Sequence, residues 1–222
     1  MKVLITGSSR GIGKEIYNLF IEQGHSVYAP NRNELDLSTE FELIHKDFDV
    51  IINNAGINPL AEIDIMNQEA VMKINYYAPL KIIQQCLPYM LKQKSGHIIN
   101  IGSIWSHISK EKRAAYSASK AALESIARSI TAEYSKFGIL ANTVSPGFIL
   151  TDLTVKNNTE EQIEQIQSEL PIKRLGTTKE IANLLGLKMN TVSTIKSNIF
   201  DKLKVDSFTH LLQLAHVHQI SY

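Results

Sequence analysis

The chain has 222 residues, 44% of them apolar, and a formal net charge of +1. This length and apolar content suit one α/β domain with a sizeable core, or a smaller domain with an appendage. The balanced charge argues against a globally basic nucleic-acid binder. Cys86, the one cysteine, falls in an apolar helical pattern, which indicates a buried thiol in a reducing cytosol. We expect a cytoplasmic protein without signal peptide or membrane span, because no apolar run approaches spanning length.

The first element is a short apolar run, residues 3–5, that leads into a glycine-rich turn with Gly7, Gly11 and Gly13. Apolar residues at helical spacing follow, so the pattern predicts strand, loop and helix. Glycines without side chains let the backbone approach a pyrophosphate at the start of a helix. The opening therefore predicts a dinucleotide-binding site.

Further strands are predicted at residues 25–29, 34–38, 49–53, 96–103 and 139–144. The strand at 34–38 follows the second strand almost directly, so this crossover is abbreviated. Helical patterns occupy residues 68–92 and a segment that begins near Tyr116, and another helical pattern lies within the polar segment 152–176. Strands that alternate with helices predict an α/β fold with a doubly wound parallel sheet.

Tyr116 and Lys120 are four residues apart and therefore share one face of their helix. A free phenol has a pKa near ~10, and an adjacent ammonium stabilises the phenolate and lowers that value. The pair is a candidate general acid-base. Chance pairs of this kind are common on solvated helices, so the interpretation depends on the neighbouring motifs.

Those motifs are Thr6-Gly7-Ser8-Ser9-Arg10-Gly11-Ile12-Gly13, Asn53-Asn54-Ala55-Gly56 and Ile101-Gly102-Ser103, with Ser103 thirteen positions before Tyr116. In this order and spacing, residues 1 to about 182 resemble the short-chain dehydrogenase/reductases, and among them the 3-oxoacyl-carrier-protein reductase-like members. The resemblance implies a Rossmann-type sheet and hydride transfer to a ketone or from a secondary alcohol.

The resemblance also implies the roles of four catalytic residues. Ser103 polarises and orients the substrate carbonyl, Tyr116 gives it a proton, and Lys120 lowers the pKa of Tyr116 and binds the ribose. Asn75 anchors a water in the proton relay, although an asparagine inside a helix can also be an exposed polar residue. No metal site is expected, and the segment 152–176 corresponds to the substrate lid.

NADP is the expected cofactor, with NAD as the weaker alternative. No acidic residue ends the second strand, whereas Arg10 and Arg32 are cations suitably placed for a 2′-phosphate. The alternative is that both arginines are solvated and Glu34 serves the ribose. Asp36 lies beside the adenine by resemblance, or caps a helix near Thr39. The resemblance implies these cofactor-binding residues: Gly7, Ser9, Arg10, Gly11, Ile12, Gly13, Arg32, Asp36, Asn54, Ala55, Gly56, Tyr116, Lys120, Pro146, Gly147, Ile149 and Thr151.

The resemblance stops before the strand that normally closes the sheet, so we predict a domain at 1–176 and a helical tail at 177–222. Residues 178–217 resemble the LuxR-type helix-turn-helix family, with Gly186 at the turn and apolar Val192, Ile195, Ile199 and Leu203 along one helix face. The opposite face carries the candidate DNA-binding residues Ser193, Lys196, Asn198 and Lys202. A plain helical hairpin is the alternative.

The sequence therefore predicts an NADP-dependent reductase of short-chain type, which acts on a small carbonyl or alcohol substrate. One alternative is a DNA-binding regulator in which the reductase-like part senses a ligand or dimerises, with duplex DNA as its partner. Another is a hybrid in which neither activity is intact. We expect a homodimer through the two long helices and no membrane partner.

Overall fold

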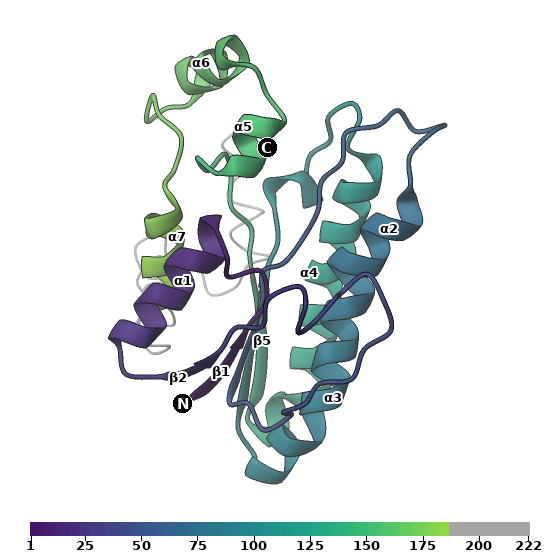
Figure 1. Cartoon of the computed structure of the whole chain (residues 1–222), viewed down its shortest axis with the longest axis vertical. Helices are drawn as coiled ribbons and strands as arrows, with labels where there is room; N and C mark the ends of the chain where they lie inside the picture. The colour runs from purple at the N-terminus through teal and green to yellow at the C-terminus, as the bar shows by residue number, and fades with distance from the viewer. Residues whose placement is uncertain (187–222) are drawn as a thin grey trace, which may run out of the picture. The chain divides into compact units, whose positions relative to one another are not determined.

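The computed structural model describes residues 1–186, and the fold lies in one compact unit, Met1–Asn183. Its centre is a parallel sheet of five strands in the order β2-β1-β3-β4-β5 (Figure 1). The strands are β1 (Lys2–Ile5), β2 (Ser26–Tyr28), β3 (Val50–Asn53), β4 (Gly96–Ile101) and β5 (Ile139–Val144). The predicted doubly wound α/β fold is confirmed.

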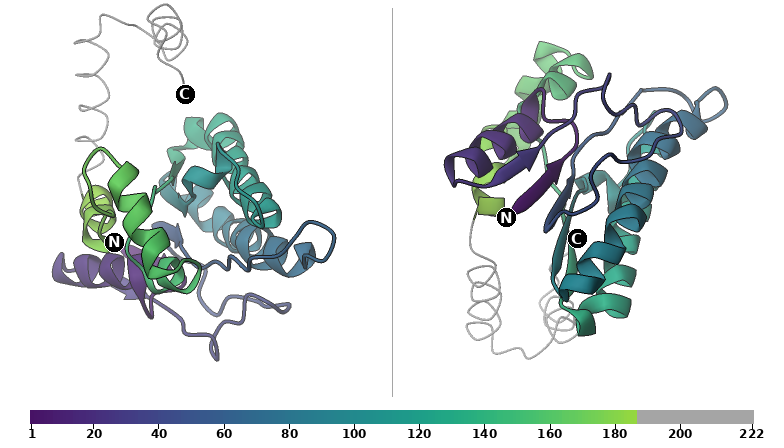
Figure 2. Two further views of the ribbon diagram at one scale, coloured as in Figure 1. Left: turned by 90° about the horizontal axis from the view of Figure 1, so that it is seen from above. Right: turned by 60° about the horizontal axis from the view of Figure 1, so that its bottom comes forward.

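Helices cover both faces of the sheet. Helix α1 (Gly11–Glu22) lies on one face, and α2 (Gln68–Met72), α3 (Ala78–Gln93) and α4 (Ala114–Tyr134) lie on the other (Figures 1 and 2). Strand β3 and residues 3–5 of β1 are completely buried, as expected for central parallel strands with helices on both sides. Within residues 1–186, no helix has the length and apolar character needed to cross a bilayer.

The predicted strand at 34–38 is wrong, because these residues form turns. The Asp36 carboxylate accepts hydrogen bonds from the backbone N–H of Ser38 at 2.8 Å and from its hydroxyl at 2.6 Å. The side chain of Asn31 likewise accepts from the backbone of Asn33 and Glu34. These local bonds satisfy backbone groups that a strand would pair with its neighbour. No helix begins near Thr39 either, so Asp36 stabilises a turn.

A buried polar bridge joins β3, β4 and α4. Asn53 and Asn100 are direct partners in the parallel ladder, and Asn53 Nδ2 donates to Asn100 Oδ1 at 2.9 Å. Asn100 Nδ2 in turn donates to the carbonyl of Leu123 in α4 at 3.2 Å. Because both asparagines are buried, each lost bond would leave a polar group without water.

The predicted helix over 68–92 is present but contains a π-helical turn, η1 (Lys73–Tyr77), between α2 and α3. Pro79 has no N–H and cannot bond the carbonyl four residues earlier, which belongs to Asn75. The helix widens at this point, and Asn75 lies in the widened turn with its side chain completely buried. Such turns are frequent at functional sites.

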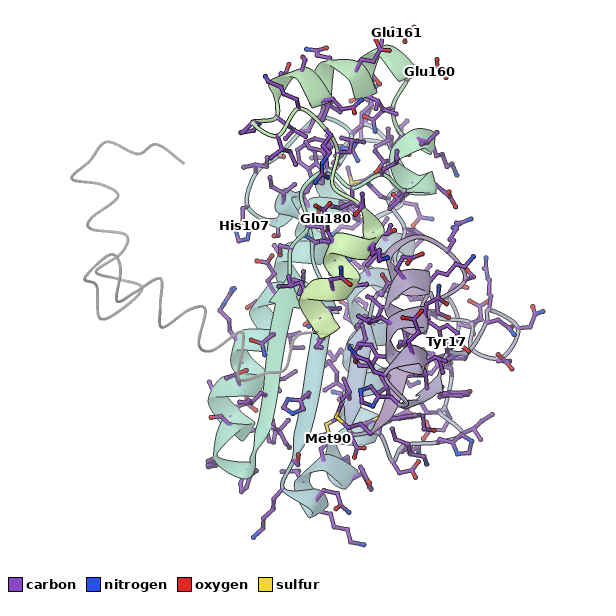
Figure 3. The ribbon with its side chains drawn as sticks, turned by 90° about the vertical axis from the view of Figure 1, so that its left-hand side faces the viewer. Tyr17, Met90, His107, Glu160, Glu161 and Glu180 are labelled. Atoms are coloured by element: carbon purple, nitrogen blue, oxygen red, sulfur yellow. The ribbon has the colours of Figure 1, made fainter. Side chains whose placement is uncertain are left out.

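The segment after β5 leaves the sheet and returns to it. It contains α5 (Asp152–Lys156) and α6 (Glu160–Glu169), so the helix predicted there is confirmed. Glu160 and Glu161 lie at the outer end of this excursion (Figure 3). Its two ends meet at a parallel bridge between Ile149 and Gly176. Helix α7 (Thr178–Gly186) begins just after the bridge.

Strand β5 is an edge of the sheet within residues 1–186, because it pairs with β4 and no later strand follows in that range. The closing strand that the sequence was expected to lack would follow α7, outside the described residues. The candidate DNA-binding residues Ser193, Lys196, Asn198 and Lys202 lie outside the described residues.

Candidate functional site

The glycine-rich turn packs directly on the loop after β3. The side chain of Asn54 donates to the carbonyls of Thr6 and Gly7 at 3.0 and 2.8 Å. A Cβ on Gly7 would stand 2.8 Å from Ala55 Cα, and one on Gly13 would stand 2.3 Å from the Gly7 carbonyl oxygen. Gly7 also has a positive φ of 69°. Larger residues at these two positions would push the loops apart.

The start of α1 is open to a ligand. Arg10 precedes the helix without a side-chain capping bond, and the first turn contains no acidic residue. The N–H groups of this turn and the positive end of the helix dipole suit an anion. Together with the closely packed glycines, this end of α1 fits the pyrophosphate of a dinucleotide.

A cleft of about 640 Å³ runs along the carboxyl ends of the strands. It brings together most of the predicted site residues: Gly7, Ser9, Arg10, Gly11, Ile12, Arg32, Asp36, Asn54, Ala55, Gly56, Ser103, Tyr116, Lys120, Pro146, Gly147, Ile149 and Thr151. Gly13 and Asn75 do not line the cleft, since both lie behind its wall. The cleft is where ligands bind in open α/β sheets.

Ser103, Tyr116 and Lys120 converge from two elements. Ser103 follows β4, and its hydroxyl accepts the backbone N–H of Trp105 at the start of η2 (Ile104–Ser106). Tyr116 and Lys120 lie on the first turns of α4. The Lys120 ammonium is buried, donates to the carbonyl of Ile101 at 2.6 Å and lies 5.7 Å from the centre of the Tyr116 ring.

The expected direction of the Tyr116 pKa is wrong in this structure. Burial raises the pKa of the Tyr116 phenol, while hydrogen bonding with Ser103 and the charge of Arg113 lower it in part. Burial also lowers the pKa of Lys120 from 10.5 to about 8. Tyr116 is therefore a protonated phenol at neutral pH, and the neighbouring cation that acts on it most is Arg113.

Asn75 is joined to Lys120 through a shared neighbour, Gly56. A Cβ on Gly56 would lie 3.3 Å from Asn75 Oδ1 and 3.6 Å from Lys120 Nζ. The Asn75 amide exchanges two hydrogen bonds of 2.9 Å with the backbone of Ile57 and donates to Ser119 at 3.0 Å. Its side chain therefore connects the loop after β3 to α4 directly beneath the cleft.

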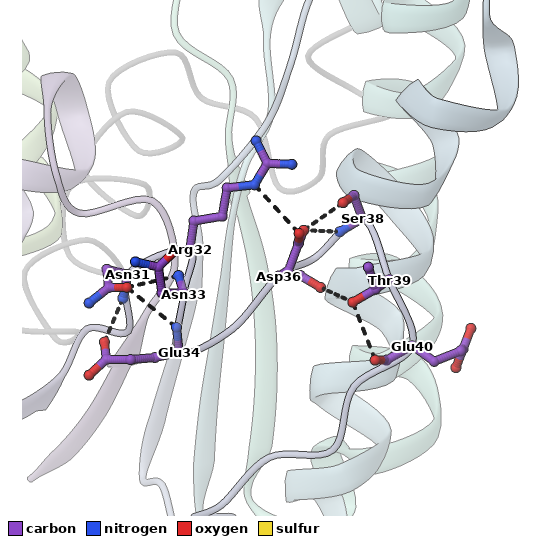
Figure 4. A network of polar contacts seen from close by, with 8 residues as sticks. All are labelled: Asn31, Arg32, Asn33, Glu34, Asp36, Ser38, Thr39 and Glu40. Atoms are coloured by element: carbon purple, nitrogen blue, oxygen red, sulfur yellow. Dashed lines mark hydrogen bonds and ion pairs between the residues drawn. The ribbon is translucent and has the colours of Figure 1, made fainter.

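At the other end of the cleft, Arg32 turns toward Asp36 and Glu34 turns away (Figure 4). Arg32 Nε lies 3.5 Å from the Asp36 carboxylate, and the Arg32 side chain is 80% exposed. Glu34 does not line the cleft, and its carboxylate accepts the backbone N–H of Asn31 at 2.8 Å. Arg10 forms a long ion pair of 3.8 Å with Asp152 and is equally accessible.

The loop after β5 completes the wall beside Ser103. The carbonyl of Pro146 accepts the N–H of Ile104 at 2.9 Å, which ties this loop to η2. Thr151 caps α5, because its hydroxyl accepts the N–H of Thr154 at 3.2 Å. Gly147 has open space where a side chain would stand. A ligand can approach the backbone at this point.

Two charged residues in or below the cleft carry no motif and escaped the sequence interpretation. Glu124 is buried, and one of its oxygens accepts the hydroxyls of Ser106 and Ser145. This carboxylate therefore fixes the loops after β4 and β5. Arg113 is also buried and lines the cleft next to Trp105. Glu124 lies within α4 and Arg113 directly before it, and a single charged residue at either place gives no periodic signal by which it could have been found.

Comparisons with known proteins agree with this geometry. The sequence model of the short chain dehydrogenase family matches residues 37–162, and that of bacterial regulatory proteins of the luxR family matches residues 176–215. The 3-oxoacyl-[acyl-carrier-protein] reductase FabG of Aquifex aeolicus is 31% identical over 193 residues, which cover 82% of this chain and 77% of the relative. FabG of Buchnera aphidicola is 32% identical over 210 residues, with 81% and 86% covered.

Solved structures show the same fold. A 4-hydroxyisoleucine dehydrogenase complexed with NADH superposes with a TM-score of 0.77 at 26% identity and covers 83% of this chain and 88% of its own. A gluconate 5-dehydrogenase from Burkholderia cenocepacia in complex with NADP and tartrate has a TM-score of 0.73 at 24% identity, with 83% and 86% covered. With its family match, its FabG relatives and this fold, the chain belongs to the short-chain dehydrogenase family, whose members bind NAD or NADP.

Proposed function

We propose that the chain is an NADP-dependent oxidoreductase that reduces a ketone or oxidises a secondary alcohol. The observation that carries the proposal is the convergence of Ser103, Tyr116 and Lys120 on a cleft that also contains the open start of α1. When bound, the dinucleotide supplies or accepts the hydride. The proposed substrate is a small molecule. We also propose that the reductase domain ends at residue 176 and that the protein is a homodimer.

In this mechanism the side chains of the chain handle the proton and the carbonyl. The Ser103 hydroxyl donates to the carbonyl oxygen and orients it. Tyr116, a protonated phenol beside Ser103, delivers a proton to the same oxygen as negative charge develops. Lys120, whose pKa of about 8 lies near neutrality, returns a proton toward Tyr116 along a relay in which Asn75 holds the neighbouring loop.

NADP is favoured over NAD because Arg10 and Arg32 line the cleft with accessible guanidinium groups. The competing ribose ligand, Glu34, is engaged with the backbone of Asn31 outside the cleft. A 2′-phosphate would gain a charge-assisted hydrogen bond from either arginine.

A second candidate function is DNA binding by the C-terminal segment, which the luxR-family match over residues 176–215 favours. The polar side chains of Ser193, Lys196, Asn198 and Lys202 would then face duplex DNA, with Lys196 and Lys202 as phosphate contacts. In that case the reductase domain would act as a sensor or dimerisation unit.

We expect Tyr116→Phe to lower kcat by about 100-fold or more, because the phenol is the proton donor. Binding of NADPH, measured by fluorescence titration, should be unchanged. Tyr134→Phe, at the other end of α4, is the matched control and should retain full activity. Turnover by Tyr116→Phe at the wild-type rate would contradict the mechanism.

We expect Arg32→Ala to weaken NADPH binding by about tenfold and to leave NADH binding unchanged, since only NADPH carries the 2′-phosphate. The exposed cation Lys14, on α1 but outside the cleft, provides the control variant Lys14→Ala. Equal losses for the two dinucleotides would exclude a phosphate contact by Arg32.

We expect Lys120→Met to abolish activity yet stabilise the fold at pH 7. The lowered pKa of Lys120 corresponds to about 3 kcal/mol of destabilisation, and the bond to Ile101 offsets about 1 kcal/mol of it. The free energy of unfolding in urea should therefore rise by about 2 kcal/mol.

The lowered pKa of Lys120 also determines how stability changes with pH. Between pH 8 and 10.5 the unfolded chain binds more protons at Lys120 than the folded chain, so wild-type stability rises with pH across that window. The advantage of Lys120→Met should shrink over the same window, whereas the exposed control Lys92→Met should show no such trend. A variant less stable than wild type at pH 7 would refute the argument.

For the second candidate, we expect the full chain to shift duplex DNA at low salt and to lose the shift as salt rises. The double variant Lys196→Ala/Lys202→Ala should not shift DNA, whereas Lys14→Ala/Lys92→Ala, with the same change of net charge, should still do so. No shift by wild type at low salt would remove this function.

A further inference from the structure

Arg113 places a buried positive charge in the wall of the cleft. It directly precedes α4, and only 6% of its surface is exposed. Its guanidinium lies 5.2 Å from the centre of the Trp105 ring, and Trp105 packs edge-on against Phe148 at 5.8 Å. All three side chains line the cleft, so the guanidinium is held on an aromatic support at its edge.

This charge has no counter-ion among residues 1–186. No carboxylate in that part of the chain forms an ion pair with Arg113, and its buried Nε has no hydrogen-bond partner. An arginine stays protonated at neutral pH, so it cannot relieve the strain of burial by losing its charge. Stacking on an aromatic ring recovers only part of the lost hydration. The cleft therefore contains an unbalanced cation that an anionic ligand would neutralise.

The position of Arg113 assigns that anion to the substrate. Arg113 lies three residues before Tyr116, lines the same cleft, and its charge acts on the Tyr116 phenol. Arg10, by contrast, lies in the glycine-rich turn and Arg32 follows β2, and both serve the dinucleotide in the proposed function. A group bound by Arg113 thus lies within a short carbon chain of the carbonyl that Ser103 and Tyr116 would hold.

We infer that Arg113 binds the carboxylate of the substrate, and that the substrate is a short oxo acid or the corresponding hydroxy acid. The inference rests on the proposed function, because it takes Tyr116 as the place of the reacting carbonyl. A guanidinium can bind a carboxylate through two parallel hydrogen bonds, which fixes the direction in which the oxo acid lies. A neutral ester, amide or thioester at the same place would leave the cation unpaired.

A binding experiment tests the inference without turnover. Trp105 is the only tryptophan of the chain, so its fluorescence reports ligands at Arg113. The full chain with NADP⁺ is titrated with butyrate and with butyramide, which differ in charge and little in shape. We expect a saturable change in Trp105 fluorescence with butyrate. Butyramide should bind at least about 10-fold more weakly or cause no change. Equal responses to both, or none to butyrate, would overturn the inference.

A kinetic experiment tests the same contact during turnover. The substrates are acetoacetate, methyl acetoacetate and the neutral thioester acetoacetyl-N-acetylcysteamine, which share one ketone. We expect wild-type kcat/KM to favour acetoacetate, and Arg113→Gln to lower that value by about 10- to 100-fold while the two neutral substrates change less than about threefold. The kcat/KM of Arg113→Lys for acetoacetate should fall between the values for wild type and for Arg113→Gln. Arg128→Gln, an exposed arginine of α4, is the control.

The outcomes separate this inference from the function beneath it. Reduction of the neutral substrates in preference to acetoacetate would overturn the role of Arg113 while the reductase activity stands. Selective butyrate binding together with full turnover by Tyr116→Phe would support Arg113 and remove the proposed mechanism. If circular dichroism shows that Arg113→Gln does not fold, the comparison of charged and neutral ligands with the wild-type protein still tests the inference.

Discussion

The asparagine bridge between Asn53, Asn100 and the carbonyl of Leu123 joins β3 to β4, which precedes Ser103, and to α4, which carries Tyr116 and Lys120. Asn53 directly precedes the loop that packs against the glycine-rich turn. Asn100 lies three residues before Ser103, and Leu123 lies one turn beyond Lys120 on α4. Because amide hydrogen bonds in a dry interior tolerate little displacement, the bridge fixes the position of the glycine-rich turn relative to Ser103, Tyr116 and Lys120.

Local patterns in the sequence were sufficient to predict most of the scaffold, because each pattern acts through nearby residues. Buried strands such as Val50–Asn53 are rich in apolar residues. The glycines at positions 7 and 13 are required by close contacts within their own turn and with the loop at Asn54 and Ala55. Residues 34–38 misled the interpretation because alternating apolar residues predict a strand, whereas Asp36 and Asn31 capture the backbone in turns. Tertiary structure decides whether the backbone forms these side-chain hydrogen bonds or pairs with a neighbouring strand.

The electrostatics of the site could not be read from spacing. Tyr116 and Lys120 were correctly placed on one helix face, yet spacing says nothing of burial, which raises the pKa of the phenol and lowers that of the ammonium. Arg113 and Glu124 are single charged residues whose importance lies in the surfaces that close over them. Whether such a residue is solvated or buried becomes visible only when the sheet, η2 and α4 are assembled.

The bridge between Ile149 and Gly176 allows the segment between them to vary in length and sequence. Leu150 donates to the Gly176 carbonyl and Gly176 donates to the Phe148 carbonyl, both at 2.9 Å, so the two stems of the segment are clamped at the rim of the sheet. Insertions, deletions or whole replacements of α5 and α6 then alter a loop whose ends already meet, at little additional entropic cost. The sheet and the loops beneath this segment can therefore stay in place while its length and sequence change.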